Sequence, residues 1–246
     1  MNKELIIVIL AGGLGKRMNS EIPKVLHFIS NKPMLLHVIE DARLLHPQRI
    51  LIVVGKYKNI ISDELQKYTT LEDVEFIIQP EPLGTGHAAQ CCKKELLYHN
   101  NANVIILSGD VPLIKSSTLS TFLSTCDKAS IITTILENPT GYGRIIEENN
   151  NFVKIIEERD CTEYEKRITK VNCGIYAFDS RILCKYIDTL SNNNSQHEYY
   201  LTDIIQIIKE NEGIHIAMYE ICKEKQHEVM GINTVEQLDE LREFSI

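Results

Sequence analysis

The chain has 246 residues, of which 43% are hydrophobic, so it is long enough for one domain with a large core. Its formal net charge is −8, and nucleic-acid binders usually show a basic excess, so we expect no nucleic-acid partner. No run of about 18 apolar residues occurs, so we expect no membrane-spanning helix.

The first half of the chain alternates apolar runs with amphipathic segments. Short apolar runs predict strands at Leu5–Leu10, Ile50–Val54 and Val104–Leu107, and the mostly apolar segment Val74–Ile78 predicts another. Apolar residues at helical spacing predict helices at Pro33–Leu45, Asn59–Tyr68 and Thr85–Leu97. This alternation predicts an α/β fold with a Rossmann-like, mostly parallel sheet and helices on both faces. Ligands of such sheets bind at the carboxyl edge of the strands, near the change in strand order.

The second half of the chain is less regular and predicts antiparallel pairs. Strands are predicted at Ser130–Leu136, Tyr142–Ile146, Phe152–Ile156, Val171–Phe178 and Ile214–Ile221. Helices are predicted at about Tyr199–Glu210 and at Thr234–Phe244, where Thr234 and Gln237 form a capping box. No repeat and no clear linker divides the chain, so we expect a single domain over residues 1–246.

A glycine-rich loop, Leu10 to Met18, follows the first predicted strand. Small residues let backbone amides approach a phosphate or a base edge, and Arg17 and Lys24 supply cations nearby. The loop lacks the Gly-Lys-Ser/Thr ending of a Walker loop, and its glycines do not have the spacing of a dinucleotide fingerprint. A glycine-rich turn with solvated cations is the alternative explanation.

The residues of this loop, with Pro23-Lys24-Val25-Leu26 after it, resemble the signature of sugar nucleotidyltransferases. Molybdenum-cofactor guanylyltransferases and cytidylyltransferases of isoprenoid synthesis carry similar loops. Later segments narrow the resemblance by their order along the chain: residues 79–88, 108–114, 141–145, 156–158, 171–174, 198–203 and 231–233. From about Glu4 to Leu241, the set resembles the uridylyltransferase domain of bacterial N-acetylglucosamine-1-phosphate uridylyltransferases.

This resemblance implies the nucleotide-diphospho-sugar transferase fold, with an antiparallel sugar-binding region. A nucleotide-binding half is expected at about 1–110, a sugar-binding half at about 111–233 and a closing helix at 234–246. The implied reaction joins UTP and N-acetylglucosamine 1-phosphate into UDP-N-acetylglucosamine and releases pyrophosphate, by direct in-line attack. Two alternatives are a nucleotidyltransferase for another sugar 1-phosphate or base, and a non-catalytic regulator that binds nucleotide sugars.

The resemblance also assigns the nucleotide contacts. These residues are Leu10, Ala11, Gly12, Gly13, Gln79, Gly84 and Thr85. The amide of Gln79 both donates and accepts, so it can read the edge of a uracil. The alternative for Gln79 is a polar residue that simply ends a strand.

Charged and metal-binding roles are implied at positions far apart in the sequence. Asp110 and Asn233 would hold Mg²⁺, a hard cation that takes oxygen ligands and keeps several waters. Lys24 would neutralise the α-phosphate of UTP, and Arg17 the β- and γ-phosphates. The alternatives are a turn residue before Pro112 for Asp110 and the start of the last helix for Asn233.

The sugar contacts implied by the resemblance are Gly143, Glu157, Asn172, Tyr200 and Thr202. Glu157 can accept from two hydroxyls, Asn172 can serve either polarity, and Gly143 leaves room for an acetamido group. For Tyr200 and Thr202, ordinary helix capping and packing is the alternative.

The chain departs from the pattern at several positions, and these departures leave the sugar selectivity open. They are Gly12 for a usual Ala, Arg159 for Lys, Cys173 for Thr and His197 for Gly. Bacterial members continue into a left-handed β-helix that transfers acetyl groups and builds a trimer. We expect neither property here, but a monomer or a weak homo-oligomer. Seven scattered cysteines without a Cys-x-x-Cys motif predict a reduced, cytoplasmic compartment.

Overall fold

A computed structural model describes residues 3–13, 15, 18, 20 and 22–244. In this part of the chain, nine strands form one sheet. The strands are β1 (Glu4–Leu10), β4 (Arg49–Val54), β5 (Val74–Ile78), β6 (Ala102–Ser108), β7 (Ala129–Ile135), β8 (Arg144–Glu148), β9 (Asn151–Ile156), β10 (Lys170–Asp179) and β11 (Ala217–Ile221). A small separate hairpin is made by β2 (Phe28–Ile29) and β3 (Lys32–Pro33).

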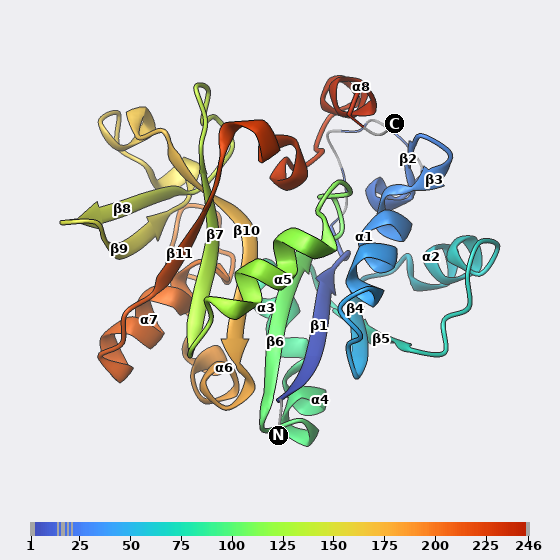
Figure 1. Cartoon of the computed structure of the whole chain (residues 1–246), viewed down its shortest axis with the longest axis horizontal. Helices are drawn as coiled ribbons and strands as arrows, with labels where there is room; N and C mark the ends of the chain where they lie inside the picture. Colours follow the sequence, from blue (N-terminus) through green and yellow to red (C-terminus); the bar gives the residue numbers. More distant parts are fainter. Residues whose placement is uncertain (1–2, 14, 16–17, 19, 21, 245–246) are drawn as a thin grey trace.

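The order across the sheet is β11-β7-β10-β6-β1-β4-β5, and β8 and β9 attach through β10 (Figure 1). The strands β5, β4, β1 and β6 pair in parallel. β10 runs antiparallel between β6 and β7, and β11 is parallel to β7. β8 and β9 form an antiparallel pair. The predicted α/β fold, with a mostly parallel sheet and an antiparallel region, is therefore confirmed.

Helices cover the sheet on both faces (Figure 1). They are α1 (Met34–Arg43), α2 (Lys58–Leu65), α3 (Thr85–Cys91), α4 (Lys93–Tyr98), α5 (Ser116–Ser124), α6 (Ser180–Tyr186), α7 (Asp203–Glu212) and α8 (Val235–Arg242). Short 3₁₀ helices are η2 (Lys24–Leu26), η3 (Glu158–Asp160), η4 (Glu165–Arg167), η5 (Ile187–Thr189) and η6 (Lys223–Val229). No helix in the described ranges is both long and apolar enough to span a membrane.

The helix predicted at Thr85–Leu97 is in fact two helices that meet at Cys92. The N–H of Cys92 bonds to Ala89 O at 3.0 Å, so a tighter turn interrupts the α-helical pattern. The predicted capping box is confirmed, because the Thr234 side chain accepts from Gln237 N and Thr234 N donates to Gln237 Oε1.

Alternate side chains of β1 pack against different helical layers. Ile6 and Val8 join the cluster that includes residues of α3, α4, α6 and α7. Ile7 and Ile9 join the cluster with residues of α1, α2 and α5. All four side chains are fully buried, and burying each contributes about 1.5–3 kcal/mol to stability. β1 is thus held from both faces, which fixes the position of its carboxyl end.

The strand order changes at β1. The next strands of the sheet along the chain, β4 and β5, lie on one side of β1, and β6 lies on the other side. Hydrogen bonds of the sheet continue past the strand ends into the loops. Ala11 N donates to Val53 O at 2.8 Å, and Gly109 N donates to Leu10 O at 2.9 Å. The loops after β1 and β6 therefore lie side by side at the edge where ligands of α/β sheets bind.

Candidate active site

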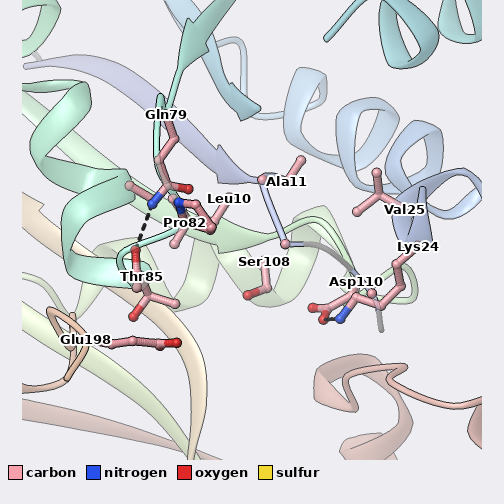
Figure 2. A pocket seen from close by; sticks show the side chains of 15 residues that line it. Leu10, Ala11, Lys24, Val25, Gln79, Pro82, Thr85, Ser108, Asp110 and Glu198 are labelled. Carbon is pink, nitrogen blue, oxygen red and sulfur yellow. Dashed lines mark hydrogen bonds and ion pairs between the residues drawn. The ribbon is translucent and has the colours of Figure 1, made fainter. Parts of the chain in front are cut away.

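A cavity of about 490 Å³ opens at this carboxyl edge of the sheet. It contains every predicted nucleotide-binding residue together with Lys24 and Asp110. Its lining residues are Leu10, Ala11, Gly12, Gly13, Gly15, Lys24, Val25, Gln79, Pro82, Gly84, Thr85, Ala88, Ser108, Asp110 and Glu198. Figure 2 shows Gln79 and Thr85 at one end and Lys24 and Asp110 at the other. We call the end with the Gln79 amide the polar end, although the Glu198 carboxylate lies there too, beside Gly84 and Thr85. The end with the Lys24–Asp110 ion pair is the charged end.

The side chain of Gln79 has a fixed orientation at the polar end. Its backbone N–H donates to Val54 O at 2.8 Å, which places it directly beyond the sheet. Its Nε2 donates to Gly84 O at 3.0 Å, drawn as a dashed line in Figure 2. Its Oε1 lies against Gly12, where an added Cβ would be only 2.8 Å away. The side chain is almost fully buried, so Oε1 is an acceptor held beside the Gly12 backbone.

The loop beside Gln79 is bonded to the segment before α7. Tyr199 N donates to Leu83 O at 2.8 Å, and Gly86 N donates to Tyr199 O at 2.7 Å. Gly84 has a φ of +107°, and a Cβ there would lie 2.6 Å from Tyr199 O, so no other residue fits without a shift. These bonds join a predicted nucleotide loop to a segment that resembles a sugar-binding motif.

The hydroxyl of Thr85 takes part in the same connection. It accepts a hydrogen bond from Leu201 N at 3.1 Å, and the rest of its side chain faces the cavity (Figure 2). The hydroxyl proton of Thr85 can still donate to another acceptor.

Lys24, Asp110 and Asn233 meet at the charged end. The Lys24 ammonium forms an ion pair with Asp110 Oδ2 and donates to Asn233 Oδ1 at 3.1 Å. Buried neighbours in η2, Val25 and Leu26, hold Lys24 in place. Ile232 N donates to Asp110 O at 2.9 Å, which draws the loop before α8 onto the turn after β6. The sequence could not predict that Lys24 would contact both predicted metal ligands.

This charged end fits a divalent metal of the kind that takes oxygen ligands. A carboxylate oxygen and an amide oxygen converge on one ammonium, which acts as a stand-in cation. No group of three or more His, Cys, Asp and Glu among the described residues has a metal-binding arrangement. Two oxygen ligands suit Mg²⁺, which usually keeps several waters and is held by one or two protein oxygens plus substrate phosphates.

The predicted sugar-binding residues lie outside the lining of this cavity and form a second cluster. Thr202 Oγ1 donates to Glu157 Oε1 at 2.9 Å. Asn172 N donates to Gly143 O at 2.9 Å, and its side-chain Nδ2 donates to Tyr176 Oη at 2.8 Å. A Cβ on Gly143 would be 3.7 Å from Glu157 Oε2. These four predicted residues are therefore brought together by side-chain and backbone contacts.

Burial dominates the electrostatics of the second cluster. It raises the pKa of the Glu157 carboxyl, and the hydrogen bond from Thr202 opposes this shift in part. Burial and the charge of Asp160 raise the pKa of Asp203, at the start of α7, to about 6. The fifth predicted residue, Tyr200, is buried, and its hydroxyl accepts from Gln196 Nε2 at 2.8 Å.

One predicted residue lies outside the described part of the chain, and two residues that line the cavity were not predicted. Arg17 is outside the described residues. Ser108 and Glu198 line the cavity but were not predicted. Ser108 ends β6 at the same edge of the sheet, and Glu198 begins the segment 198–203 that carries part of the resemblance. Cys173 packs in the core beside Ile175, and burial raises the pKa of its thiol. The Cys173 side chain is therefore part of the core and does not line this cavity.

Sequence comparison finds relatives over the whole chain. The nucleotidyl transferase family matches residues 6–223. A probable UDP-N-acetylglucosamine pyrophosphorylase of Acanthamoeba polyphaga mimivirus is 44% identical over 250 residues, which cover 100% of this chain and 98% of that protein. The bifunctional protein GlmU of Clostridium botulinum (strain Eklund 17B / Type B) is 39% identical, over 96% of this chain and 51% of GlmU. The chain spans about half the length of the GlmU relatives that it matches.

Solved structures share the fold at low sequence identity. A putative glucose-1-phosphate thymidylyltransferase of Bacillus anthracis, in complex with a sucrose, superposes with a TM-score of 0.74 at 19% identity, over 98% of this chain and 95% of that one. A UDP-glucose pyrophosphorylase complexed with UDP-glucose gives a TM-score of 0.76 at 17% identity, over 98% of both chains. At such identities the likeness concerns the arrangement of helices and strands alone.

Proposed function

The chain belongs to the nucleotidyl transferase family, and from this premise we propose that it joins UTP to N-acetylglucosamine 1-phosphate. The products are UDP-N-acetylglucosamine and pyrophosphate. The observation that carries the proposal is the cavity with a fixed amide at one end and a cation beside two oxygen ligands at the other. Among the relatives, it is supported by the mimiviral protein, which is 44% identical over 98% of that protein's length.

The nucleophile of this reaction is a phosphate oxygen that is already anionic at neutral pH. A general base is therefore not needed to activate it. The main difficulties are bringing two polyanions together and stabilising the charge that develops on the leaving pyrophosphate. Positioning and electrostatic stabilisation are the principal means of catalysis for such transfers.

We assign the charge stabilisation to Lys24 and Arg17, with Lys24 at the α-phosphate and Arg17 at the β- and γ-phosphates. Asp110 and Asn233 would hold a divalent metal, which we take to be Mg²⁺ from the oxygen ligands that they offer. Such an ion withdraws charge from the phosphate oxygens that it binds. The Lys24 ammonium and a metal ion cannot occupy the same point between Asp110 and Asn233. When those oxygens hold a metal, Lys24 is therefore available to a phosphate.

The remaining predicted residues would orient the two substrates. The Gln79 acceptor lies beside the Gly12 backbone, which suits the N3–H and carbonyl edge of uracil. The cluster of Gly143, Glu157, Asn172 and Thr202 would bind the sugar. On this assignment residues 1–110 supply most nucleotide contacts, and residues 111–233 supply most sugar contacts. Glu198, from the second of these segments, also lines the cavity.

We also propose a cytoplasmic location and a monomer or weak homo-oligomer. All seven cysteines are free, which fits a reduced compartment. UTP and N-acetylglucosamine 1-phosphate are the proposed partners.

The test is an assay of pyrophosphate release with the common nucleoside triphosphates and several sugar 1-phosphates. We expect the highest kcat/KM for UTP with N-acetylglucosamine 1-phosphate, and dependence on added Mg²⁺. Faster release with another base or sugar would support a different nucleotidyltransferase. Binding of the nucleotide sugar without any release would support a regulator instead.

A further inference from the structure

Among the fully buried side chains of the described residues, that of Arg144 is the largest, and it is 1% exposed. Arg144 begins β8, one residue after the predicted sugar contact Gly143. Burying a guanidinium costs much desolvation free energy, and replacing a buried ion pair by well-packed apolar residues is often neutral or stabilising. Stability of the fold therefore does not require an arginine at this position.

The contacts of Arg144 join the loop before β8 to the segment after β9. Its Nη1 donates to Tyr142 O. Its Nη2 donates to Glu158 Oε2 at 2.5 Å and to Lys166 O at 3.3 Å. The same Glu158 oxygen accepts from Gly141 N at 3.3 Å. One ion pair, between the buried Arg144 and the partly exposed Glu158, thus fixes the two segments relative to each other.

Each of these segments carries a predicted sugar contact next to the ion pair. Gly143 is the residue before Arg144, and Glu157 is the residue before Glu158. Gly143 also accepts through its carbonyl from Asn172 N at 2.9 Å. Movement of either segment would displace these sugar contacts, whereas the Gln79 and Lys24 ends of the cavity are built on other loops.

We propose that Arg144 and Glu158 are positioning residues that set the geometry of the sugar-binding cluster and so the selectivity for the sugar 1-phosphate. This inference rests on the proposed function. The Arg144 side chain is buried, so we assign it an effect through Gly143 and Glu157 and no direct contact with the sugar. The planar guanidinium can donate to a carbonyl and a carboxylate at once in a fixed geometry, which the single ammonium of a lysine cannot reproduce.

Two conservative variants test the proposal. Arg144→Lys keeps the charge and loses the fork, and Glu158→Gln keeps the shape and loses the charge. We expect kcat/KM for the sugar 1-phosphate to fall by about 10- to 100-fold, because displacing a reacting group by about 1 Å has effects of that size. The change should appear mainly in KM for the sugar 1-phosphate, while KM for UTP stays within about twofold of wild type.

A matched control is Asp179→Asn, which likewise neutralises a carboxylate that is paired with an arginine. Asp179 is 3% exposed and accepts from Lys3 and Arg181. It pairs in register with Asn103, at the end of β6 remote from Asp110. This variant should lower the urea concentration at which the protein unfolds and leave both KM values unchanged.

Equal changes in both KM values, or none in a folded variant, would overturn the positioning role. Failure of both variants to fold while Asp179→Asn folds would do the same, because it would assign the pair to stability alone. Assaying the wild-type chain alongside distinguishes failure of the proposed function from failure of the positioning role. Absence of turnover by wild type counts against the proposed function, and normal wild-type turnover with unchanged variants counts against the role of Arg144 and Glu158.

Discussion

At the scale of single residues, Lys24 contacts both proposed metal ligands, and its proposed role can be tested separately from theirs. Its ammonium binds Asp110 and Asn233, and its side chain is 12% exposed. We predict that Lys24→Ala lowers kcat by about 10²- to 10³-fold, the usual cost of removing one preorganised charged group. Binding of Mn²⁺, followed by electron paramagnetic resonance, should not weaken, because the competing ammonium is gone.

The control for this prediction is Lys93→Ala, which removes a lysine that is paired with exposed Asp188. It should leave kcat and Mn²⁺ binding near wild type, since surface ion pairs contribute little. A folded Lys24→Ala protein with near-wild-type turnover would contradict the phosphate role of Lys24.

Gly84 gives a second prediction at this scale. Its φ of +107° suits glycine alone, and a Cβ would lie 2.6 Å from Tyr199 O. We predict that Gly84→Ala destabilises the protein by about 1–3 kcal/mol, the cost of a residue held in such a backbone region. The displaced loop carries the oxygen that orients Gln79, so KM for UTP should rise by about tenfold or more. Urea unfolding and initial rates measure the two effects.

Gly213→Ala is the matched control, because Gly213 also has a positive φ, of +61°, with no other atom near the added Cβ. It ends α7, away from the cavity lining. It should cost about 1–2 kcal/mol of stability and leave KM for UTP unchanged. If both variants changed KM alike, the effect of Gly84→Ala would be one of stability.

The sequence places single residues well where a strand ends at the ligand edge. Gln79 and Asp110 both follow a predicted strand, and both line the cavity. The sequence cannot show contacts across long separations, such as Lys24 with Asn233 or Glu157 with Thr202. No local pattern encodes them, because they depend on how distant loops pack. The resemblance to known enzymes, and not periodicity, brought Asp110 and Asn233 together.

At the scale of elements, the start of α8 fixes the position of Asn233. Gln237 Oε1 accepts from Asn233 N at 2.7 Å and from Thr234 N at 3.2 Å. We predict that Gln237→Ala weakens Mn²⁺ binding by about 10-fold or more, as is usual when a group that orients a metal ligand is removed. A titration of Mn²⁺ into the protein measures the effect.

The control lies on the same helix. Glu240 is exposed, so Glu240→Ala should leave Mn²⁺ binding unchanged. Unaltered Mn²⁺ affinity in Gln237→Ala would show that the start of α8 does not position Asn233 as a metal ligand.

Elements with strong apolar periodicity are predicted well, and those with few apolar residues are missed. The strands β1, β4 and β6 contain continuous apolar runs, β5 is apolar except for Glu75, and all four appear close to their predicted bounds. Helix α5, Ser116–Ser124, is rich in Ser and Thr, which favour turns and caps over helix interiors. The helix predicted from Tyr199 begins at Asp203, because the backbone of Tyr199 bonds to Leu83 and Gly86 instead.

At the scale of the whole molecule, the alternation of strands and helices predicts the parallel half of the sheet but not the placement of β10. β10 enters antiparallel between β6 and β7, although two other strands separate it from β7 along the chain. The apolar residues of β10 are compatible with either a parallel or an antiparallel place in the sheet. The pairing of β10 with β6 and β7 joins residues far apart in the sequence, and apolar periodicity does not encode such contacts.

The pH dependence of folding is a property of the whole chain to which Asp203 makes a defined contribution. Burial and the charge of Asp160 raise its pKa to about 6 in the folded protein, from 3.8 ordinarily. The folded state therefore holds this proton more tightly than the unfolded state. The contribution of Asp203 to stability is fully present below about pH 4 and is lost as the pH rises through about 6.

An asparagine at this position cannot titrate. We predict that Asp203→Asn unfolds at a higher urea concentration than wild type at pH 7.5, and that the difference shrinks steadily as the pH falls from about 6 to about 4. Other groups titrate in both proteins, so their effect largely cancels when the two free energies of unfolding are subtracted. A difference that stayed constant between pH 4 and pH 7.5 would mean that the Asp203 carboxyl has an ordinary pKa. Burial at the start of α7 would then impose no cost on its charge, and the sugar-binding cluster would be more open to water than the structure indicates.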